Sequence, residues 1–331
     1  MVKFSDYMYD WLYGDKGYYT RYKEIGKEGD FYTSVSTSKF FGGSIAKHII
    51  SIIEEGFLPA NTTICEIGAH KGYLLADIVQ FIYTLRPELL ESLSFITVER
   101  FDFLQEAQDR YFEESFGNVV KLSHVKSLSE LNLDSAFFVA NEIFDAFSCE
   151  LIYKEKMGSL QDGKIVFEEE NPWLSEMAKK YGKDKGEIAL GYEEFALEMR
   201  DAAKTFEFMT YDYGEMQARG DFSIRVYKEH EVFPLFDDSL SLEEVFAVTD
   251  ITYDVCFEHL KDAYSQAGIE MIEYKTQALA LVDMGLLELL EMLKTNGSDE
   301  MYTHEIERAK QLILPDFLGE RFKMMKFRQK S

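Results

Sequence analysis

The chain has 331 residues, and its 60 acidic and 35 basic side chains give it a formal charge of −25. Binding to nucleic acids or anionic membranes depends on Lys and Arg that pair with phosphates, so this charge argues against both kinds of partner. Hydrophobic residues make up 46% of the chain and aromatic residues 15%, which is too much apolar surface for a disordered acidic protein and predicts a folded globular one.

The apolar pattern of the first half predicts helices and strands that alternate. In chain order it predicts a helix at 36–55, a strand at 62–67, a helix at 72–86, a strand at 93–99, a helix at 101–115, a weak strand near 119–125 and a strand at 135–140. Strands that alternate with helices at this spacing are typical of a parallel α/β sheet.

The middle of the chain interrupts this alternation. Residues 150–157 and 164–169, joined across Asp162-Gly163, predict a β-hairpin, and helices are expected at 173–181 and 192–204. A strand at 205–211 then resumes the sheet, followed by a helix at 252–267, a strand at 269–275, a helical region at 276–313 and a last strand at 321–328.

This order of elements suggests a division into domains. We expect an N-terminal helical or lid segment at 1–60, a core at 61–147 and 205–331, an insertion lobe at 148–204 and a second, irregular insertion at about 214–250.

Neither metal sites nor targeting segments are predicted. The three cysteines form no CxxC pair and the six histidines form no metal-spaced pair, so we assign no metal and no disulfide framework. The first residues resemble neither a signal peptide nor an Arg-rich transit peptide, and no run of about 18 apolar residues occurs. These features predict a cytoplasmic protein.

The segment Glu66-Ile-Gly-Ala-His-Lys-Gly72 joins a predicted strand to a predicted helix. Glycines Gly68 and Gly72 let backbone N–H groups and a helix N-terminus face a polar ligand group, at the sheet edge where open α/β sheets bind ligands. Glu99 ends the next strand, where a carboxylate can accept hydrogen bonds from both ribose hydroxyls. Together they predict a ligand that contains a nucleoside, and the alternative is an ordinary strand–helix turn.

The glycine spacing also discriminates between cofactors. The dinucleotide fingerprint GxGxxG is absent, because His70 stands between the two glycines and is expected to line the cofactor cleft. An adenosine with a small charged tail therefore fits better than a pyrophosphate, and an NAD-dependent oxidoreductase is disfavoured.

A second polar cluster, Ala140-Asn-Glu-Ile-Phe-Asp-Ala146, follows the strand at 135–140. Asn141 can bond a ligand ammonium or an acceptor group. Glu142 and Asp145 place two carboxylates at i and i+3, which can hold a guanidinium in a bidentate manner and take up the proton that an alkylated nitrogen releases. The alternative is a capped helix start with a solvated Asp145.

Two further segments are weaker candidates. Asp212-Tyr213-Gly214 ends the strand at 205–211 and is expected to face the same crevice, although a plain strand-end turn is an equal alternative. Thr33 and Ser34 close the segment Gly29–Ser34 before the first long helix. Their hydroxyls can serve a ligand beneath a lid of Phe31 and Tyr32, or simply cap a helix.

Taken in order, these segments resemble the MidA family of class I S-adenosylmethionine-dependent methyltransferases, which includes a mitochondrial assembly factor of respiratory complex I. The resemblance covers nearly the whole chain. The segments that match the family are Gly29–Ser34, Phe41-Gly42, Glu66–Gly72 with Leu75–Ile78, Ala140–Ala146, Asp212–Gly214, Asp250–Thr252 and Thr276-Gln277.

The resemblance implies a Rossmann-like class I methyltransferase fold, with a seven-stranded, mostly parallel sheet, helices on both faces and an inserted α+β substrate lobe. It implies methyl transfer from S-adenosylmethionine to a protein, with arginine as the acceptor in the mitochondrial members. A protein with a cationic acceptor side chain, such as a respiratory-complex subunit, is then the expected partner, and a homodimer is compatible with this. A catalytically weak or inactive assembly scaffold is the alternative.

The resemblance also implies roles for individual residues. Those expected to hold the cofactor are Thr33, Ser34, Glu66, Gly68, His70, Gly72, Glu99 and Asn141. Glu142 and Asp145 are expected to receive the acceptor guanidinium as the catalytic pair, and Asp212 and Tyr213 to bind the substrate. The chain departs from the family at Gly68–Gly72, where the family usually has GPGRG, and at Asp254 and Cys256, which replace a His and an Asp.

Overall fold

The computed structural model describes residues 1–20, 33–217, 219–228 and 231–330, and its contacts divide the chain into two compact units. The sheet unit comprises Tyr32–Asn141, Leu197–Tyr211 and Gly268–Ser331, and the lobe unit comprises Met1–Phe31, Glu142–Ala196 and Asp212–Ala267. These boundaries differ from those of the domains expected from the sequence, which stay a prediction.

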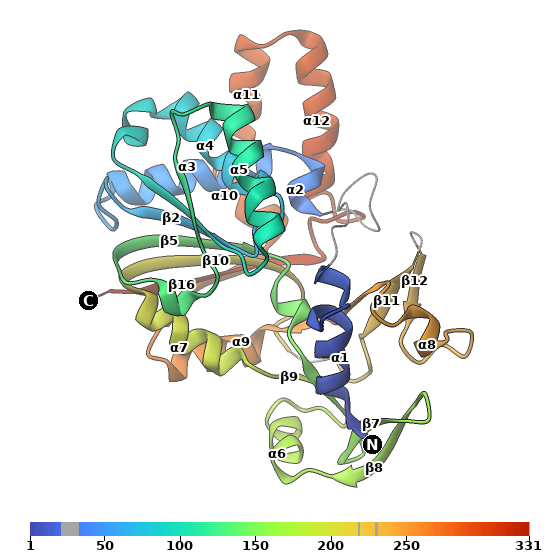
Figure 1. The fold of residues 1–331 in the computed structure, drawn as a ribbon. Coiled ribbons are helices and arrows are strands. Elements are labelled where there is room, and N and C mark those ends of the chain that lie inside the picture. Colours follow the sequence, from blue (N-terminus) through green and yellow to red (C-terminus); the bar gives the residue numbers. More distant parts are fainter. Residues whose placement is uncertain (21–32, 218, 229–230, 331) are drawn as a thin grey trace. The chain divides into compact units, whose positions relative to one another are not determined.

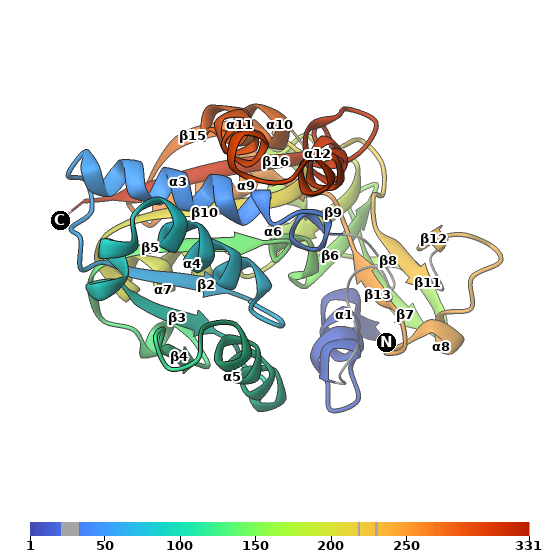
Figure 2. The same ribbon diagram turned by 90° about the horizontal axis from the view of Figure 1, so that it is seen from above.

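A mixed sheet with the strand order β15-β16-β10-β5-β2-β3-β4 forms the centre of the sheet unit (Figures 1 and 2). Its strands are β2 (Thr63–Ile67), β3 (Ser94–Val98), β4 (Leu122–Val125), β5 (Leu133–Asn141), β10 (Ala203–Glu215), β15 (Glu270–Thr276) and β16 (Phe322–Gln329). The neighbours from β4 to β10 pair in parallel, whereas β15 and β16 pair antiparallel. All five residues of β2 are buried, as expected for an apolar strand in the middle of a sheet.

Helices α3 (Phe40–Glu54) and α4 (Tyr73–Leu85) lie side by side over β2, β5 and β10 (Figures 1 and 2). Their apolar residues form one core cluster with residues of these strands and of the C-terminal helices. Close approach of the two helices requires Gly42, because a Cβ atom there would lie 2.6 Å from the Cβ of Asp77. The other helices of the sheet unit are α2 (Ser34–Thr37), η2 (Pro87–Glu91), α5 (Asp102–Phe116), η3 (Leu128–Glu130), α10 (Gln277–Asp283), α11 (Leu286–Asn296) and α12 (Asp299–Ile313).

The lobe unit contains a five-stranded sheet and a three-stranded one. The first is built from β1 (Val2–Lys3), β6 (Cys149–Tyr153), β7 (Lys156–Gln161), β8 (Lys164–Glu170) and β9 (Lys185–Ala189), and the second from β11 (Arg225–Lys228), β12 (Glu231–Pro234) and β13 (Asp250–Thr252). Its helices are α1 (Phe4–Tyr13), η1 (Tyr18–Thr20), η4 (Phe144–Ala146), α6 (Pro172–Lys180), α8 (Leu242–Val245) and α9 (Phe257–Gln266), while α7 (Tyr192–Ala202) has residues in both units.

The N-terminal helix is part of the lobe unit rather than a separate segment. The Trp11 indole N–H donates to the Thr249 carbonyl over 2.7 Å, and the Ser5 hydroxyl donates to the Glu150 carboxylate over 2.6 Å. Trp11 is fully buried, so α1 supplies core as well as hydrogen bonds.

The α/β class expected from the sequence is confirmed, and several details differ. Strand β14 (Val255–Cys256) pairs with β10 at Gly214 and Glu215, so the large sheet has eight strands where seven were expected. The expected hairpin is a three-stranded meander, because the chain also turns at Lys154 and Glu155, both with positive φ.

Other corrections concern boundaries. Strand β9 lies between α6 and α7, where none was expected, and β11, β12 and α8 lie in the segment expected to be irregular. The helix expected at 36–55 begins only at Phe40, and the region 276–313 is three helices. Among the described residues, no helix combines the length and hydropathy needed to cross a lipid bilayer.

Candidate functional site

A left-handed turn joins β2 to α4 in the sheet unit. Gly68, His70 and Gly72 have φ angles of 70°, 48° and 76°, so the glycines occupy a conformation that other residues rarely adopt. His70 accepts this conformation although it has a side chain. Gly72 is the N-cap of α4 and provides no side-chain hydrogen bond, so the N-terminus of the helix presents backbone N–H groups.

Glu66 lies beneath this turn and fastens it to α4. Its carboxylate is 5% exposed and accepts a hydrogen bond from the Leu75 N–H over 2.9 Å. Burial raises the pKa of Glu66 to about 8, against the lowering effect of that hydrogen bond, and the nearby Asp77 and Glu99 raise it further. Glu66 therefore supports the turn from inside the protein.

Glu99, which follows β3, is brought against the same turn. Its carboxylate is 6% exposed and accepts hydrogen bonds from the backbone N–H groups of Phe101, Arg100 and His70. Burial raises the pKa of Glu99 to about 7, although these hydrogen bonds and the Arg100 charge oppose the shift. The structure thus joins the two segments that the sequence analysis assigned to one ligand.

Thr33 and Ser34 are occupied by structural hydrogen bonds. Thr33 forms a capping box with Ser36 at the start of α2. The Ser34 hydroxyl is buried and donates to the Gln277 side-chain oxygen over 2.8 Å. The guanidinium of Arg308 on α12 donates to the carbonyls of Ser36 and Thr37, so α2 is tied to the C-terminal helices. The preceding residues 29–32 of the predicted lid lie outside the described residues.

Glu142 belongs to the segment Ala140–Ala146, which is expected to receive the acceptor, and has an unusual backbone conformation. Its φ angle is 56°, a left-handed conformation that is uncommon for a glutamate and is found preferentially at functional sites. The carboxylate of Asp212 accepts hydrogen bonds from the N–H groups of Ile143 and Phe144 over 3.4 and 3.2 Å. Asp212 thus fixes the turn that presents Glu142.

Asp212 itself is buried completely, and its Oδ1 atom has no hydrogen-bond partner among the described residues. Burial raises its pKa well above the usual range, and the charge of Asp145 adds to this shift. Asp212 therefore holds backbone groups of the neighbouring turn, and its expected role in substrate binding stays a prediction.

Asp145 is also turned inward. It is 4% exposed and accepts a hydrogen bond from Tyr213, whose hydroxyl is hydrogen-bonded to Thr252. Burial raises the pKa of Asp145 to about 6, while Tyr213 and Arg225 act in the opposite direction. The Arg225 guanidinium stacks on the Tyr213 ring, 4.4 Å from its centroid, and pairs with Asp254 over 2.6 Å. Of the expected carboxylate pair, only Glu142 is half-exposed.

Asn141 is the last residue of β5 and lies in register with Tyr211 of β10. It is half-buried and belongs to the sheet unit, whereas Glu142, the next residue, belongs to the lobe unit. The expected cofactor residues thus fall within the sheet unit, and the expected catalytic and substrate residues fall within the lobe unit.

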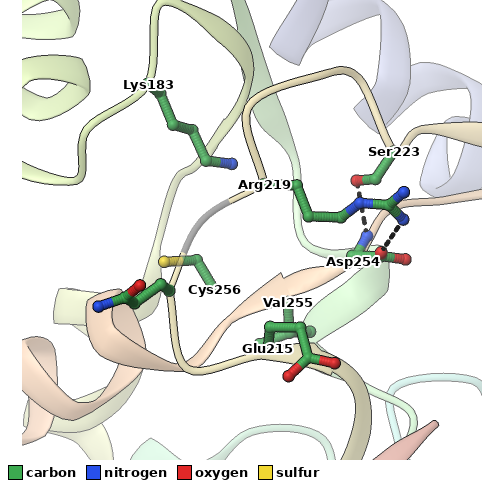
Figure 3. Close-up of a pocket in the computed structure, with 8 residues that line it drawn as sticks. Lys183, Glu215, Arg219, Ser223, Asp254, Val255 and Cys256 are labelled. Carbon is green, nitrogen blue, oxygen red and sulfur yellow. Dashed lines mark hydrogen bonds and ion pairs between the residues drawn. The ribbon is translucent and has the colours of Figure 1, made fainter.

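The lobe unit also contains a small open hollow of about 200 Å³ (Figure 3). Its lining residues are Lys183, Glu215, Gln217, Arg219, Ser223, Asp254, Val255 and Cys256. Arg219 pairs with Asp254 over 2.7 Å at its edge, and none of the residues expected from the sequence lines it.

Two polar groups outside the sequence motifs contact expected site residues. Gln108, in the middle of α5, donates to the His70 carbonyl over 2.7 Å, and Arg225 faces Asp145 and Tyr213. A glutamine within a helix and an arginine in a short strand carry no local motif, and only spatial neighbours reveal their roles.

The comparisons of this chain with known proteins agree with one another. Residues 44–275 match the model of a family described as "Putative S-adenosyl-L-methionine-dependent methyltransferase". The mitochondrial protein arginine methyltransferase NDUFAF7 of Xenopus tropicalis is 22% identical over 97% of this chain and 81% of its own length. The human protein of the same name is 22% identical over 93% of this chain and 75% of its own length.

A solved structure has the same fold. The crystal structure of a Burkholderia thailandensis protein, bound to S-adenosyl-homocysteine, superposes with a TM-score of 0.81 at 20% identity, over 99% of this chain and 88% of that one. The cytoplasmic location predicted from the sequence is wrong on this comparison, because the curated relatives are named as mitochondrial proteins.

Proposed function

Because the chain belongs to the family of S-adenosyl-L-methionine-dependent methyltransferases, we propose that it methylates an arginine side chain of a protein substrate. The arginine acceptor is suggested by the relatives, which are named as protein arginine methyltransferases at 22% identity. A respiratory-complex subunit as the substrate and a homodimer as the assembly stay predictions.

The sheet unit offers donors and acceptors that suit the cofactor. The left-handed turn at Gly68–Gly72 leads into the N-terminus of α4, whose positive dipole end suits the carboxylate of a methionine moiety. Glu99 sits against the turn and suits a ribose diol. His70 stands where the family usually has a glycine, yet it adopts the same left-handed conformation as its neighbours in the turn. This departure from the family therefore does not favour an inactive scaffold.

We assign the remaining cofactor contacts by position. Asn141 ends β5 and would line the methionine side, while Glu66 would support the turn from below. Thr33 and Ser34 would shape the lid through backbone and packing, because their hydroxyls are engaged elsewhere. We interpret the seven strands from β15 to β4 as the Rossmann-like class I methyltransferase core.

The observation that carries the arginine proposal is that Glu142 is a partly exposed glutamate with a left-handed backbone, followed by a turn whose Ile143 and Phe144 N–H groups donate to Asp212. When bound, the cofactor supplies an electrophilic sulfonium methyl group. Glu142 would hold the guanidinium by charge-assisted hydrogen bonds and accept the proton that the methylated nitrogen loses. Asp145 would affect the acceptor only indirectly, through its hydrogen bond with Tyr213, and would not contact it.

Replacement of Glu142 tests this proposal. We expect Glu142→Gln to lower methyl transfer to an arginine-containing protein by about 10²–10⁴-fold, as for a lost general base, with S-adenosyl-homocysteine affinity unchanged. Labelled cofactor with intact-mass analysis of the substrate measures transfer, and calorimetry measures affinity. Glu155→Gln is a matched control, because Glu155 is another glutamate with positive φ in the lobe unit.

The outcomes separate the parts of the proposal. Loss of transfer and of cofactor affinity together in Glu142→Gln would contradict the acceptor role. A folded wild-type protein that binds neither S-adenosylmethionine nor S-adenosyl-homocysteine at millimolar concentration would contradict the enzyme itself.

A further inference from the structure

We propose that Gln108, Thr97 and His124 form a hydrogen-bond relay that positions the Gly68–Gly72 turn, and that the relay is complete only when His124 is protonated on both ring nitrogens. This inference rests on the proposed role of that turn in cofactor binding. It assigns positioning roles to three residues that the sequence motifs do not include.

The first link joins α5 to the turn. The Gln108 side-chain nitrogen lies 2.7 Å from the His70 carbonyl oxygen, which can only accept a hydrogen bond. The orientation of the Gln108 amide is therefore determined, and its oxygen must accept. Gln108 is fully buried, and its Cγ would lie 3.3 Å from a Cβ atom at Gly72, so the side chain fills the space behind the turn.

The second link continues to β3 and β4. Thr97 is fully buried, and its hydroxyl lies 2.8 Å from the Gln108 oxygen, so it donates its single proton there. The same hydroxyl oxygen lies 2.7 Å from the Nδ1 atom of His124, which pairs with Thr97 across the two strands. Since the Thr97 proton is already used, Nδ1 must carry a hydrogen and donate it.

The last link requires a positive charge on the His124 ring. The Nε2 atom of His124 lies 2.9 Å from the Asp109 carboxylate, which is an acceptor when ionised. A neutral His124 with its hydrogen on Nδ1 would face this carboxylate with a lone pair. An imidazolium instead donates at both nitrogens, so three hydrogen bonds run from Nδ1 through Thr97 and Gln108 to the turn, and a fourth runs from Nε2 to Asp109.

The charged group in contact with the His124 ring lies on α5. Asp109 on α5 is the ionised group against the ring, with 62% of its side chain exposed, while 13% of the His124 side chain is exposed. On the neighbouring strand the partner is the uncharged Thr97. The nearest basic residue along β4, Lys126, pairs with Asp102 at the start of α5. A neutral His124 that keeps its hydrogen on Nε2 for the Asp109 carboxylate can no longer donate from Nδ1 to Thr97, so deprotonation breaks the link between His124 and Thr97.

Cofactor affinity measured against pH tests the relay. We expect Thr97→Val to bind S-adenosyl-homocysteine about tenfold more weakly than wild type near pH 6, the effect of about one hydrogen bond, and the difference to shrink toward about pH 9. Thr210→Val is the matched control, because Thr210 is equally buried in the same sheet and its hydroxyl has no hydrogen-bond partner among the described residues.

Asp109→Asn provides the opposite test. An amide at this exposed position can donate to the Nε2 atom of a neutral His124, so the relay survives without the charge. We expect this variant to bind as tightly as wild type near pH 6 and to lose less affinity than wild type toward about pH 9, because Glu66 and Glu99, which also titrate in this range, are the same in both proteins. A Thr97→Val variant with wild-type affinity at both pH values, or an Asp109→Asn variant that weakens like wild type, would overturn the proposal.

A measurement without cofactor separates the relay from the proposed function. We expect ¹⁵N-detected spectra of the apo protein near pH 6 to show a hydrogen on His124 Nδ1 that is engaged in a strong hydrogen bond, and Nδ1 to lose that hydrogen bond in Thr97→Val. A neutral ring with its hydrogen on Nε2 contradicts the relay whether or not the cofactor binds. Failure of every variant and of wild type to bind, with the expected spectra, would instead count against the proposed cofactor site.

Discussion

The carboxylate of Glu66 is buried in the sheet unit, where it accepts a hydrogen bond from the Leu75 N–H. Its pKa is raised from 4.5 to about 8 by burial, so between these values the folded protein binds a proton that the unfolded chain does not. The free energy of unfolding of the apo protein must therefore fall as pH rises through this window, by at most about 1.4 kcal/mol per pH unit for this group.

Glu66→Gln should flatten this dependence. The side-chain oxygen of the introduced amide can still accept from the Leu75 N–H, while the proton uptake disappears, so we expect the variant to be more stable than wild type at about pH 8 and similar at about pH 5. Denaturant unfolding at both pH values measures this, with Glu88→Gln on the exposed η2 as the control. Equal pH slopes in Glu66→Gln and wild type would contradict the assignment.

How far residue roles could be predicted depends on whether a residue belongs to a motif. Glu66, Glu99 and Glu142 stand at strand ends next to glycines or other polar residues, and the structure places each at a turn. Gln108 and Thr97 are indistinguishable in sequence from a surface glutamine on a helix and a buried threonine in a strand. Their significance arises only from the hydrogen bonds that the fold allows.

At the scale of elements, the packing of α3 on α4 depends on a glycine. A Cβ atom at position 42 would lie 2.6 Å from Asp77 Cβ and 3.3 Å from the Leu74 carbonyl oxygen, both on a helix packed in the core. We expect Gly42→Ala to lower the free energy of unfolding by about 1–3 kcal/mol, the usual cost of overpacking. Gly220→Ala, where a Cβ meets no atom within 4 Å, should be close to neutral.

Denaturant midpoints measure both variants. A Gly42→Ala protein as stable as Gly220→Ala would mean that α3 shifts away from α4 without cost, and would contradict the close packing.

Elements with a regular apolar pattern were predictable, and those without it were not. The central strands β2, β3 and β5 are buried apolar runs, and their positions were expected to within two residues. Strand β9 (Lys185–Ala189) carries two charged residues and a glycine within five positions, which hides its pairing with β6. Lys154 and Glu155 adopt positive φ angles although the turn contains no glycine or asparagine. The sequence therefore has no turn motif that would indicate where β7 begins.

At the scale of the whole molecule, the charge of −25 affects the encounter with a cationic protein. Long-range attraction raises the rate of association at low ionic strength and is screened over about 8–10 Å at physiological salt. We expect the KM for a basic protein substrate to rise several-fold between about 20 mM and about 300 mM salt. Initial rates of methyl transfer measure this.

Binding of S-adenosyl-homocysteine, which carries no net charge, serves as the control and should change little over the same range. A KM that is independent of salt would show that the acidic surface plays no part in substrate capture.

The position of β16 has a consequence for how the protein is made. This strand, close to the end of the chain, hydrogen-bonds between β10 and β15, and its Arg328 donates to the buried Glu207 of β10 over 2.6 Å. During translation, β2 to β5 emerge early, but the edge of β10 (Ala203–Glu215) stays uncovered until Phe322–Gln329 have been synthesised. The nascent chain therefore carries an open sheet edge while the residues between β10 and β16 are made, and such an edge is prone to pairing with other chains.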